Sequence, residues 1–169
     1  MTPAPQLKQT VMANFSATHN TASPGRVVIL VAPDFEEAPL VHCLSQMRGG
    51  GLTVLLVSAV AGLISSRYGL TIRPDVLIDQ VLLAAPPRLV IVSGGRACAL
   101  ALMADPRIHQ LIDTALSSGG YVAATATAQA AVTGAGVPTP SLKARFMTQG
   151  RLEPGDFVSR LANLALGPL

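Results

Sequence analysis

Short runs of apolar residues, many of them β-branched, recur along the chain and are separated by segments with helical periodicity. The runs cover residues 26–32, 52–60, 88–93 and 121–124. Strands that are apolar on both faces are typical of a parallel sheet with helices on both sides. The β-α-β order at the start of the chain implies parallel pairing with a right-handed crossover. The sequence therefore predicts an α/β fold with a mainly parallel sheet of roughly five or six strands.

Capping signals mark the starts of the helices between these strands. Asp34, with Glu37 three residues later, predicts an N-terminal capping box. Asp105 followed by Pro106 predicts a capped start with proline in the first turn. Asp156 is the predicted cap of the last helix.

Two later segments depart from the regular alternation of strand and helix. Residues 63–80 contain short alternating stretches separated by Gly69 and Pro74, a pattern that predicts a small hairpin or excursion away from the sheet. Residues 134–141 are rich in Gly and Pro and are expected to form a loop. One more short strand is expected within residues 143–149.

The composition favours one core and a weakly charged surface. Half of the residues are hydrophobic but only 4% are aromatic, so the core must consist mainly of Val, Leu, Ile and Ala. Charged residues make up 12%, against roughly 25% in typical soluble domains. A surface this poor in charge favours self-association, so we expect a homo-oligomer, most simply a homodimer. We expect one domain over residues 25–169, preceded by a disordered polar tail over residues 1–24.

Charge and residue pattern disfavour several classes of protein. The net charge is +3 and the pI about 9.3, but Lys and Arg are scattered and form no face of the kind that binds nucleic acid. No apolar run is long enough to span a membrane. Residues 1–24 lack the features of a secretory signal, so a cytoplasmic location is expected. Cys43 and Cys98 lie in separate apolar patterns without ligand spacing, and neither a metal nor another cofactor is predicted.

A predicted strand, elbow and helix form the candidate reactive segment. Residues 121–124 match the strand and residues 128–132 the start of the helix. In many hydrolytic α/β folds a sharp turn of this kind exposes a nucleophile. Here the tip carries Ala126, flanked by Thr125 and Thr127. A methyl group cannot attack a substrate.

Four segments of the chain match a known family in order and spacing. They are residues 27–41 (VVILVAPDFEEAPLV), 63–81 (LISSRYGLTIRPDVLIDQV), 88–100 (RLVIVSGGRACAL) and 119–136 (GGYVAATATAQAAVTGAG). Together they resemble the ThiJ/PfpI family of the class I glutamine-amidotransferase-like superfamily. The resemblance implies a flavodoxin-like three-layer sandwich that is often dimeric. It also implies an elbow cysteine activated by an acidic side chain from the first helix start, with backbone N–H groups at the elbow and after a Gly-Gly pair forming an oxyanion site.

When the family's motif is compared with this chain position by position, the chain lacks the atom that would attack a substrate. The cysteine position is Ala126, and the next position, where some members have His, is Thr127. The acidic partner falls on Pro39 in an ungapped alignment, and a shift in register would make Glu37 the partner instead. Glu36 and Glu37 are otherwise explained by the electrostatics of a helix N-terminus.

The resemblance also implies that the oxyanion scaffold remains, because the Gly-Gly pair is kept at Gly94 and Gly95. Arg96 follows at the C-terminal end of a strand, where α/β sheets bind ligands. It is either an exposed arginine or a clamp for an anion. The predicted ligand-binding residues are Gly94, Gly95, Arg96, Thr125 and Thr127.

The predicted function is that of a catalytically silent ThiJ/PfpI-like protein that binds a small anionic ligand or a protein partner at the vestigial site. The alternative is a residual cysteine- or threonine-dependent hydrolase, glyoxalase or deglycase-type enzyme. Cys98, two residues beyond Arg96, would supply its thiol, or one of the elbow threonines its hydroxyl.

Overall fold

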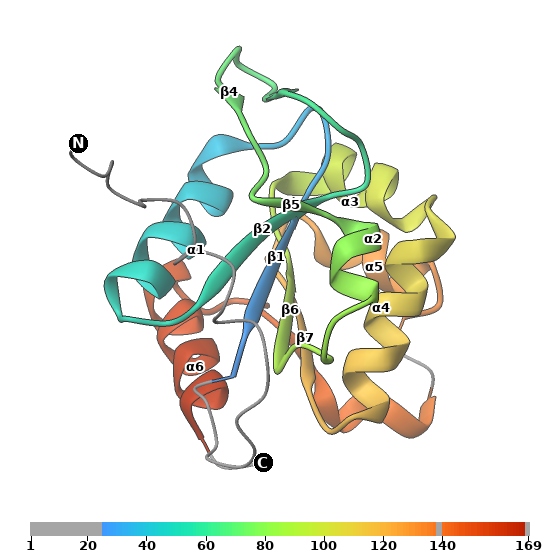
Figure 1. The fold of residues 1–169 in the computed structure, drawn as a ribbon. Helices are drawn as coiled ribbons and strands as arrows, with labels where there is room; N and C mark the ends of the chain where they lie inside the picture. The colour runs from blue at the N-terminus through green and yellow to red at the C-terminus, as the bar shows by residue number, and fades with distance from the viewer. Residues whose placement is uncertain (1–24, 138–139, 168–169) are drawn as a thin grey trace, which may run out of the picture.

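The computed structural model describes residues 25–137 and 140–167, which form a six-stranded sheet between two layers of helices (Figure 1). The strands lie in the order β5-β2-β1-β6-β7-β8, and every adjacent pair is parallel. Their bounds are β1 Val27–Val31, β2 Val54–Ser58, β5 Val76–Leu77, β6 Leu89–Val92, β7 Tyr121–Ala124 and β8 Phe146–Thr148. The predicted α/β fold with a mainly parallel sheet is confirmed. The predicted tail, residues 1–24, lies outside the described residues.

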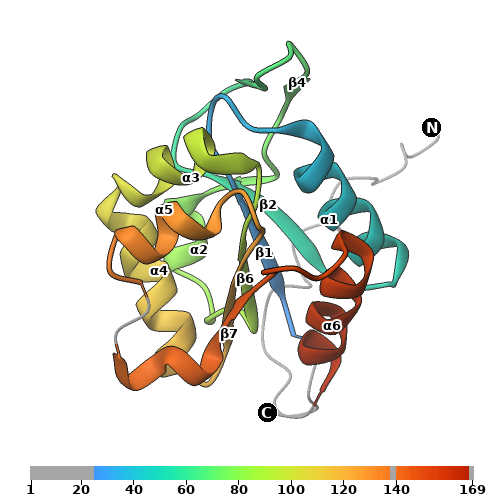
Figure 2. The same ribbon diagram turned by 180° about the vertical axis from the view of Figure 1, so that it is seen from behind.

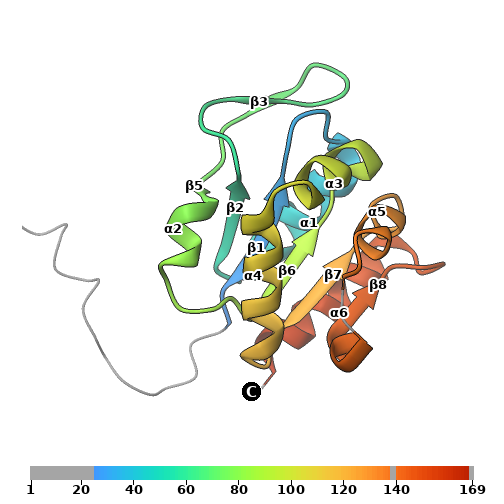
Figure 3. The same cartoon turned by 90° about the vertical axis from the view of Figure 1, so that its right-hand side faces the viewer.

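The helices divide between the two faces of the sheet. α1 and α6 cover one face, and α2, α3, α4 and α5 cover the other (Figures 2 and 3). Their bounds are α1 Glu37–Gly49, α2 Ile78–Leu82, α3 Gly95–Met103, α4 Pro106–Ser117, α5 Gln129–Gly134 and α6 Pro154–Leu166, with a 3-10 helix at Pro140–Arg145. Without edge strand β5, the strand order corresponds to the flavodoxin-like order 2-1-3-4-5. The expected flavodoxin-like three-layer architecture is therefore present.

The sheet is buried because its central strands are apolar on both faces. Every residue of β1 and β6 is fully buried, as expected for parallel strands covered by two helical layers. Parallel strands place their carboxyl ends along one edge, so the loops after β1, β6 and β7 meet there. These loops and the helix starts that follow them contain Glu36, the Gly94-Gly95 pair and the elbow around Ala126.

The predicted excursion leaves the main sheet as a small hairpin. β3 (Ile64–Ser65) and β4 (Thr71–Ile72) pair antiparallel, and the chain returns to the sheet through β5. The Glu37 carboxylate accepts hydrogen bonds from the Ser66 hydroxyl and, at 3.3 Å, from the Tyr68 N–H. These two bonds connect the hairpin to the start of α1. The bond from Ser66 holds the pKa of Glu37 below its ordinary value.

The predicted cap at Asp34 is wrong. α1 begins after Glu36, and Asp34 adopts a left-handed backbone conformation with a φ of 60°. The hairpin holds this turn, because the Asp34 N–H donates to the Ser65 carbonyl and the Arg67 N–H donates to the Phe35 carbonyl. A tertiary contact therefore overrides the local capping signal.

The other two predicted caps have different outcomes. Asp156 is not the cap of α6, because the helix begins at Pro154 with Glu153 as its N-cap, which leaves Asp156 in the first turn. The first turn of a helix tolerates a proline, because an N–H at that position has no partner within the helix. Pro154 therefore favours this earlier start. Asp105 does cap α4, and it accepts a hydrogen bond of 2.9 Å from the Arg107 N–H.

Candidate functional site

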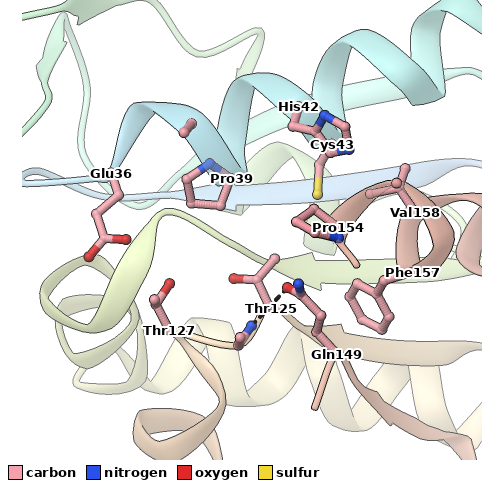
Figure 4. A pocket seen from close by; sticks show the side chains of 13 residues that line it. Glu36, Pro39, His42, Cys43, Thr125, Thr127, Gln149, Pro154, Phe157 and Val158 are labelled. Carbon is pink, nitrogen blue, oxygen red and sulfur yellow. Dashed lines mark hydrogen bonds between the residues drawn. The ribbon is translucent and has the colours of Figure 1, made fainter. Parts of the chain in front are cut away.

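A cavity of about 490 Å³ lies at the carboxyl edge of the sheet, beside the elbow between β7 and α5 (Figure 4). One wall is formed by Thr125, Ala126 and Thr127, and the others by α1, the loop after β8 and the start of α6. We call this space the elbow cavity. Among the described residues that line it, Glu36 is the only Asp, Glu, Lys or Arg.

The elbow turns the chain directly from the strand into the helix. The Thr125 carbonyl accepts the N–H groups of Ala128 and Gln129 at 3.0 and 2.9 Å. Ala126 and Thr127 are exposed and line the elbow cavity. The tip of the turn therefore presents a methyl group to the cavity.

Gln149, in the loop after β8, holds the elbow in place. The Ala126 N–H donates to the side-chain oxygen of Gln149 at 3.0 Å. The amide nitrogen of Gln149 donates to the Leu152 carbonyl at 3.0 Å. These two bonds fix the side chain that closes the lower wall of the cavity (Figure 4).

α1 brings Pro39 to the elbow cavity and turns Glu37 away from it. Pro39 and Glu36 line the same cavity as Ala126. The Glu37 side chain lies outside this lining, because its carboxylate is bonded to Ser66 of the hairpin. The structure therefore places Pro39, rather than Glu37, across from the elbow (Figure 4).

The space beside Gly95, the second glycine of the Gly94-Gly95 pair, is occupied by the Glu36 side chain. Both glycines are left-handed, with φ of 92° and 88°. A Cβ added to Gly95 would lie 2.3 Å from the carboxyl carbon of Glu36, so the missing side chain makes room for this carboxylate. The Glu36 carboxylate lies at the N-terminus of α3, where the helix dipole favours a negative charge. This part of the predicted ligand site therefore already holds a carboxylate of the chain itself.

Arg96 does not join the elbow threonines. It is exposed and lines a second hollow, between α3 and α5, together with Leu100 and Ala130. Of the predicted ligand-binding residues, Thr125 and Thr127 line the elbow cavity. The structure thus separates the predicted anion clamp from the elbow.

The two thiols are buried and carry raised pKa values. Cys98 is fully buried behind Gly94, and its Sγ accepts a hydrogen bond of 3.3 Å from the Ala32 N–H. Cys43 is 1% exposed and lines the elbow cavity from α1. Burial raises the pKa of each thiol to about 11. Both side chains are therefore uncharged at neutral pH.

Sequence reasoning missed part of the cavity wall. His42 and Cys43 line it from α1, Gln149 from the loop after β8, and Phe157 from α6. The spacing of His42 and Cys43 from Pro39 is three and four residues, which places all three on one face of a helix. That spacing could have identified the first two residues. Nothing in the sequence pattern links Gln149 or Phe157 to the elbow.

Two polar atoms of the lining residues are buried without a hydrogen-bond partner. They are Oγ1 of Thr125 and Nε2 of His42, and neither finds a partner among the described residues. Buried polar groups are normally paired. These two atoms are therefore candidates for contact with a bound molecule.

Within the part of the chain that the structure describes, no three His, Cys, Asp or Glu side chains gather closely enough to hold a metal ion. None of the described helices combines the length and the apolar character needed to cross a bilayer.

Comparisons with known proteins agree with this fold. The sequence profile of the DJ-1/PfpI family matches residues 25–149. DJ-1beta of Drosophila melanogaster superposes with a TM-score of 0.71 at 19% identity, covering 85% of this chain and 91% of the other. A cysteine-to-alanine mutant of a DJ-1 superfamily protein from Salmonella typhimurium gives 0.70 at 21% identity, covering 82% and 89%. Oxidized DJ-1 of Toxoplasma gondii gives 0.70 at 18% identity, covering 83% and 90%. No curated protein sequence matches the chain significantly.

Proposed function

This chain belongs to the DJ-1/PfpI family, and we propose that it is a catalytically silent member that binds a small molecule in the elbow cavity without covalent attack from Ala126. One observation carries the proposal: a cavity of about 490 Å³ has an alanine methyl at the tip of its elbow wall. Small-molecule sites are typically cavities of this size, mainly apolar with a few polar groups.

The chain's own nucleophiles support a noncovalent role. Burial raises the pKa of Cys43 and of Cys98 to about 11, so roughly one thiol in ten thousand is ionised at neutral pH. The buried Thr125 hydroxyl has no hydrogen-bond partner among the described residues, whereas a nucleophilic hydroxyl needs a base bonded to it. Neither the two thiols nor the Thr125 hydroxyl therefore gives the residual-enzyme alternative an activated nucleophile.

Filling the elbow cavity is expected to abolish ligand binding. A thermal-denaturation screen of small carboxylates, phosphates, amides and amines identifies a ligand. A ligand at a concentration of a hundred times its Kd stabilises the protein by about 2.7 kcal/mol. For a chain of this length the melting temperature should then rise by roughly 5–10 °C. Ala126→Phe is expected to remove this rise, because its ring enters the elbow cavity.

Ala130→Phe is the matched control, because it places the same ring in the hollow that Arg96 lines. It should leave the rise unchanged. An anion that still binds to Ala126→Phe but not to Ala130→Phe would locate the ligand at Arg96 and overturn the proposal. A screen without any stabilising compound would also overturn it.

We also propose that the protein is a cytoplasmic homodimer. Large apolar side chains are exposed along the segment that leads into the hairpin and forms it: Val60 (47%), Leu63 (63%), Tyr68 (78%) and Leu70 (44%). Apolar side chains concentrated on one exposed surface are typical of a protein interface. The two free, buried cysteines suit a reducing compartment.

Charging the hairpin is expected to dissociate the dimer. Leu63→Lys combined with Tyr68→Lys should raise the dimer dissociation constant at least about tenfold, because apolar contacts are replaced by like charges. Sedimentation velocity at several concentrations measures this change. Leu83→Lys is the control, since Leu83 is 90% exposed after α2, away from the hairpin. A wild-type monomer, or a double variant that stays dimeric, would contradict the proposed interface.

A further inference from the structure

We propose that the ligand of the elbow cavity is a small primary amine with an apolar body, an inference that rests on the noncovalent binding proposed above. The cavity has an acidic polar end and an apolar end (Figure 4). Glu36 and Thr127 lie at the polar end, Phe157 and Val158 lie at the opposite end, and Thr125 lies between them. A ligand that matches both ends carries a hydrogen-bond donor on an apolar group.

Glu36 gives the polar end a negative charge, and no Lys or Arg in the described part of the chain forms an ion pair with it. No Lys or Arg is found among the described residues that line the cavity. An ammonium group would form a charge-assisted hydrogen bond with this carboxylate. A ligand carboxylate would meet a like charge, which interfaces avoid.

Two threonine hydroxyls add acceptors, Thr127 at the same end and Thr125 next to it in the middle of the cavity (Figure 4). Thr125 is 3% exposed, and its Oγ1 has no hydrogen-bond partner among the described residues. The Thr127 hydroxyl lies on the side of the cavity that holds the Glu36 carboxylate (Figure 4). A primary ammonium carries three N–H donors, so it can donate to the carboxylate and still have donors for hydroxyl oxygens that line the same cavity. A ligand N–H that reaches Thr125 would also relieve an unpaired buried group.

The opposite end suits an apolar body. Phe157 and Val158, on α6, are 1% and 2% exposed, and Pro154 continues this wall. Cys43 faces them from α1, and because burial raises the pKa of its thiol to about 11 it is uncharged at neutral pH. An aromatic ring or a short branched chain would bury its surface against these side chains.

Three probes of similar size and different charge test the inference. Benzylamine, benzamide and benzoate carry one polar group on the same ring and are positive, neutral and negative at neutral pH. Isothermal titration calorimetry at low salt is expected to give benzylamine at least about tenfold tighter binding than benzoate, with benzamide between them.

The outcomes separate this inference from the proposed function. Binding of benzamide or benzoate that equals or exceeds that of benzylamine, and that Ala126→Phe removes, would overturn the amine while leaving a small-molecule site at the elbow. Failure of all three probes, together with a failed screen, would overturn both.

A charge-removing variant tests the contact itself. Glu36→Gln keeps the size of the side chain and is expected to weaken benzylamine binding about tenfold. Benzamide binding should stay within about twofold, which also shows that the variant is folded. The matched control Glu153→Gln removes an equal charge from the exposed N-cap of α6, beside the cavity but outside its lining. Equal losses in the two variants would indicate a general effect of charge and overturn the inference.

Discussion

Replacing Ala126 by cysteine is expected to give a thiol that iodoacetamide alkylates about a hundredfold faster than either native cysteine at neutral pH. Burial raises the pKa of Cys43 and of Cys98 to about 11, so about 0.01% of each is thiolate, against about 3% for a thiol of ordinary pKa. A thiolate of higher pKa is more nucleophilic, which reduces the rate advantage expected from the thiolate fractions by roughly tenfold. Access supplies the rest, because the native thiols are 1% and 0% exposed and position 126 is exposed. Mass spectrometry of the labelled peptides over time measures the three rates.

A second substitution tests whether α1 faces the elbow. Adding Pro39→Glu to Ala126→Cys places a carboxylate across the cavity, where it changes the pKa of the new thiol. The pH dependence of alkylation should then move by at least about half a unit. Val41→Glu is the control, because Val41 is 46% exposed and lies outside the cavity lining. Slow alkylation of Ala126→Cys would contradict the arrangement of the elbow and α1. A pH dependence of alkylation that Pro39→Glu leaves unchanged would contradict it as well.

The central strands could be predicted because burial on both faces leaves a continuous apolar run. β1, β2, β6 and β7 fall within the predicted runs. β5 and α2 could not be predicted in the same way. They have two and five residues, which is too short for a period to emerge. They form where the chain returns from the hairpin to the edge of the sheet.

The direction of Arg96 depends on packing that the sequence does not specify. Residues 97–103 (ACALALM) are all apolar, so no polar stripe indicates which face of α3 turns toward the sheet. Packing buries Cys98, Ala99 and Leu102. This rotation leaves Arg96 beside α5 rather than at the elbow.

The tip of the elbow could be located from the sequence, but its support could not. The strand run and the following helix pattern place Ala126 at the turn. Its N–H is bonded to the side chain of Gln149, 23 residues further along the chain. A contact of this kind depends on how β8 and α6 pack. It leaves no periodic signal in the sequence.

Gly94→Ala is expected to lower the free energy of unfolding by about 3 kcal/mol. Gly94 has a φ of 92°, and a residue with a Cβ pays about 1–2 kcal/mol to adopt a left-handed conformation. The added Cβ would lie 3.0 Å from Cβ of Phe35 and 3.2 Å from Sγ of Cys98. Both neighbours are fully buried, and overpacking in such a place costs about 1–3 kcal/mol.

Gly62→Ala separates the two contributions to this loss. Gly62 has a φ of 94°, and its added Cβ would meet no atom within 4 Å, so about 1–2 kcal/mol of backbone strain is expected alone. Urea unfolding of both variants measures the difference, which should be at least about 1 kcal/mol. Equal losses would show that Phe35 and Cys98 give way to the methyl group. Because the Gly94 carbonyl accepts the Glu36 N–H at 2.6 Å, displacement of Gly94 should also move the Glu36 carboxylate and weaken benzylamine binding by the folded variant.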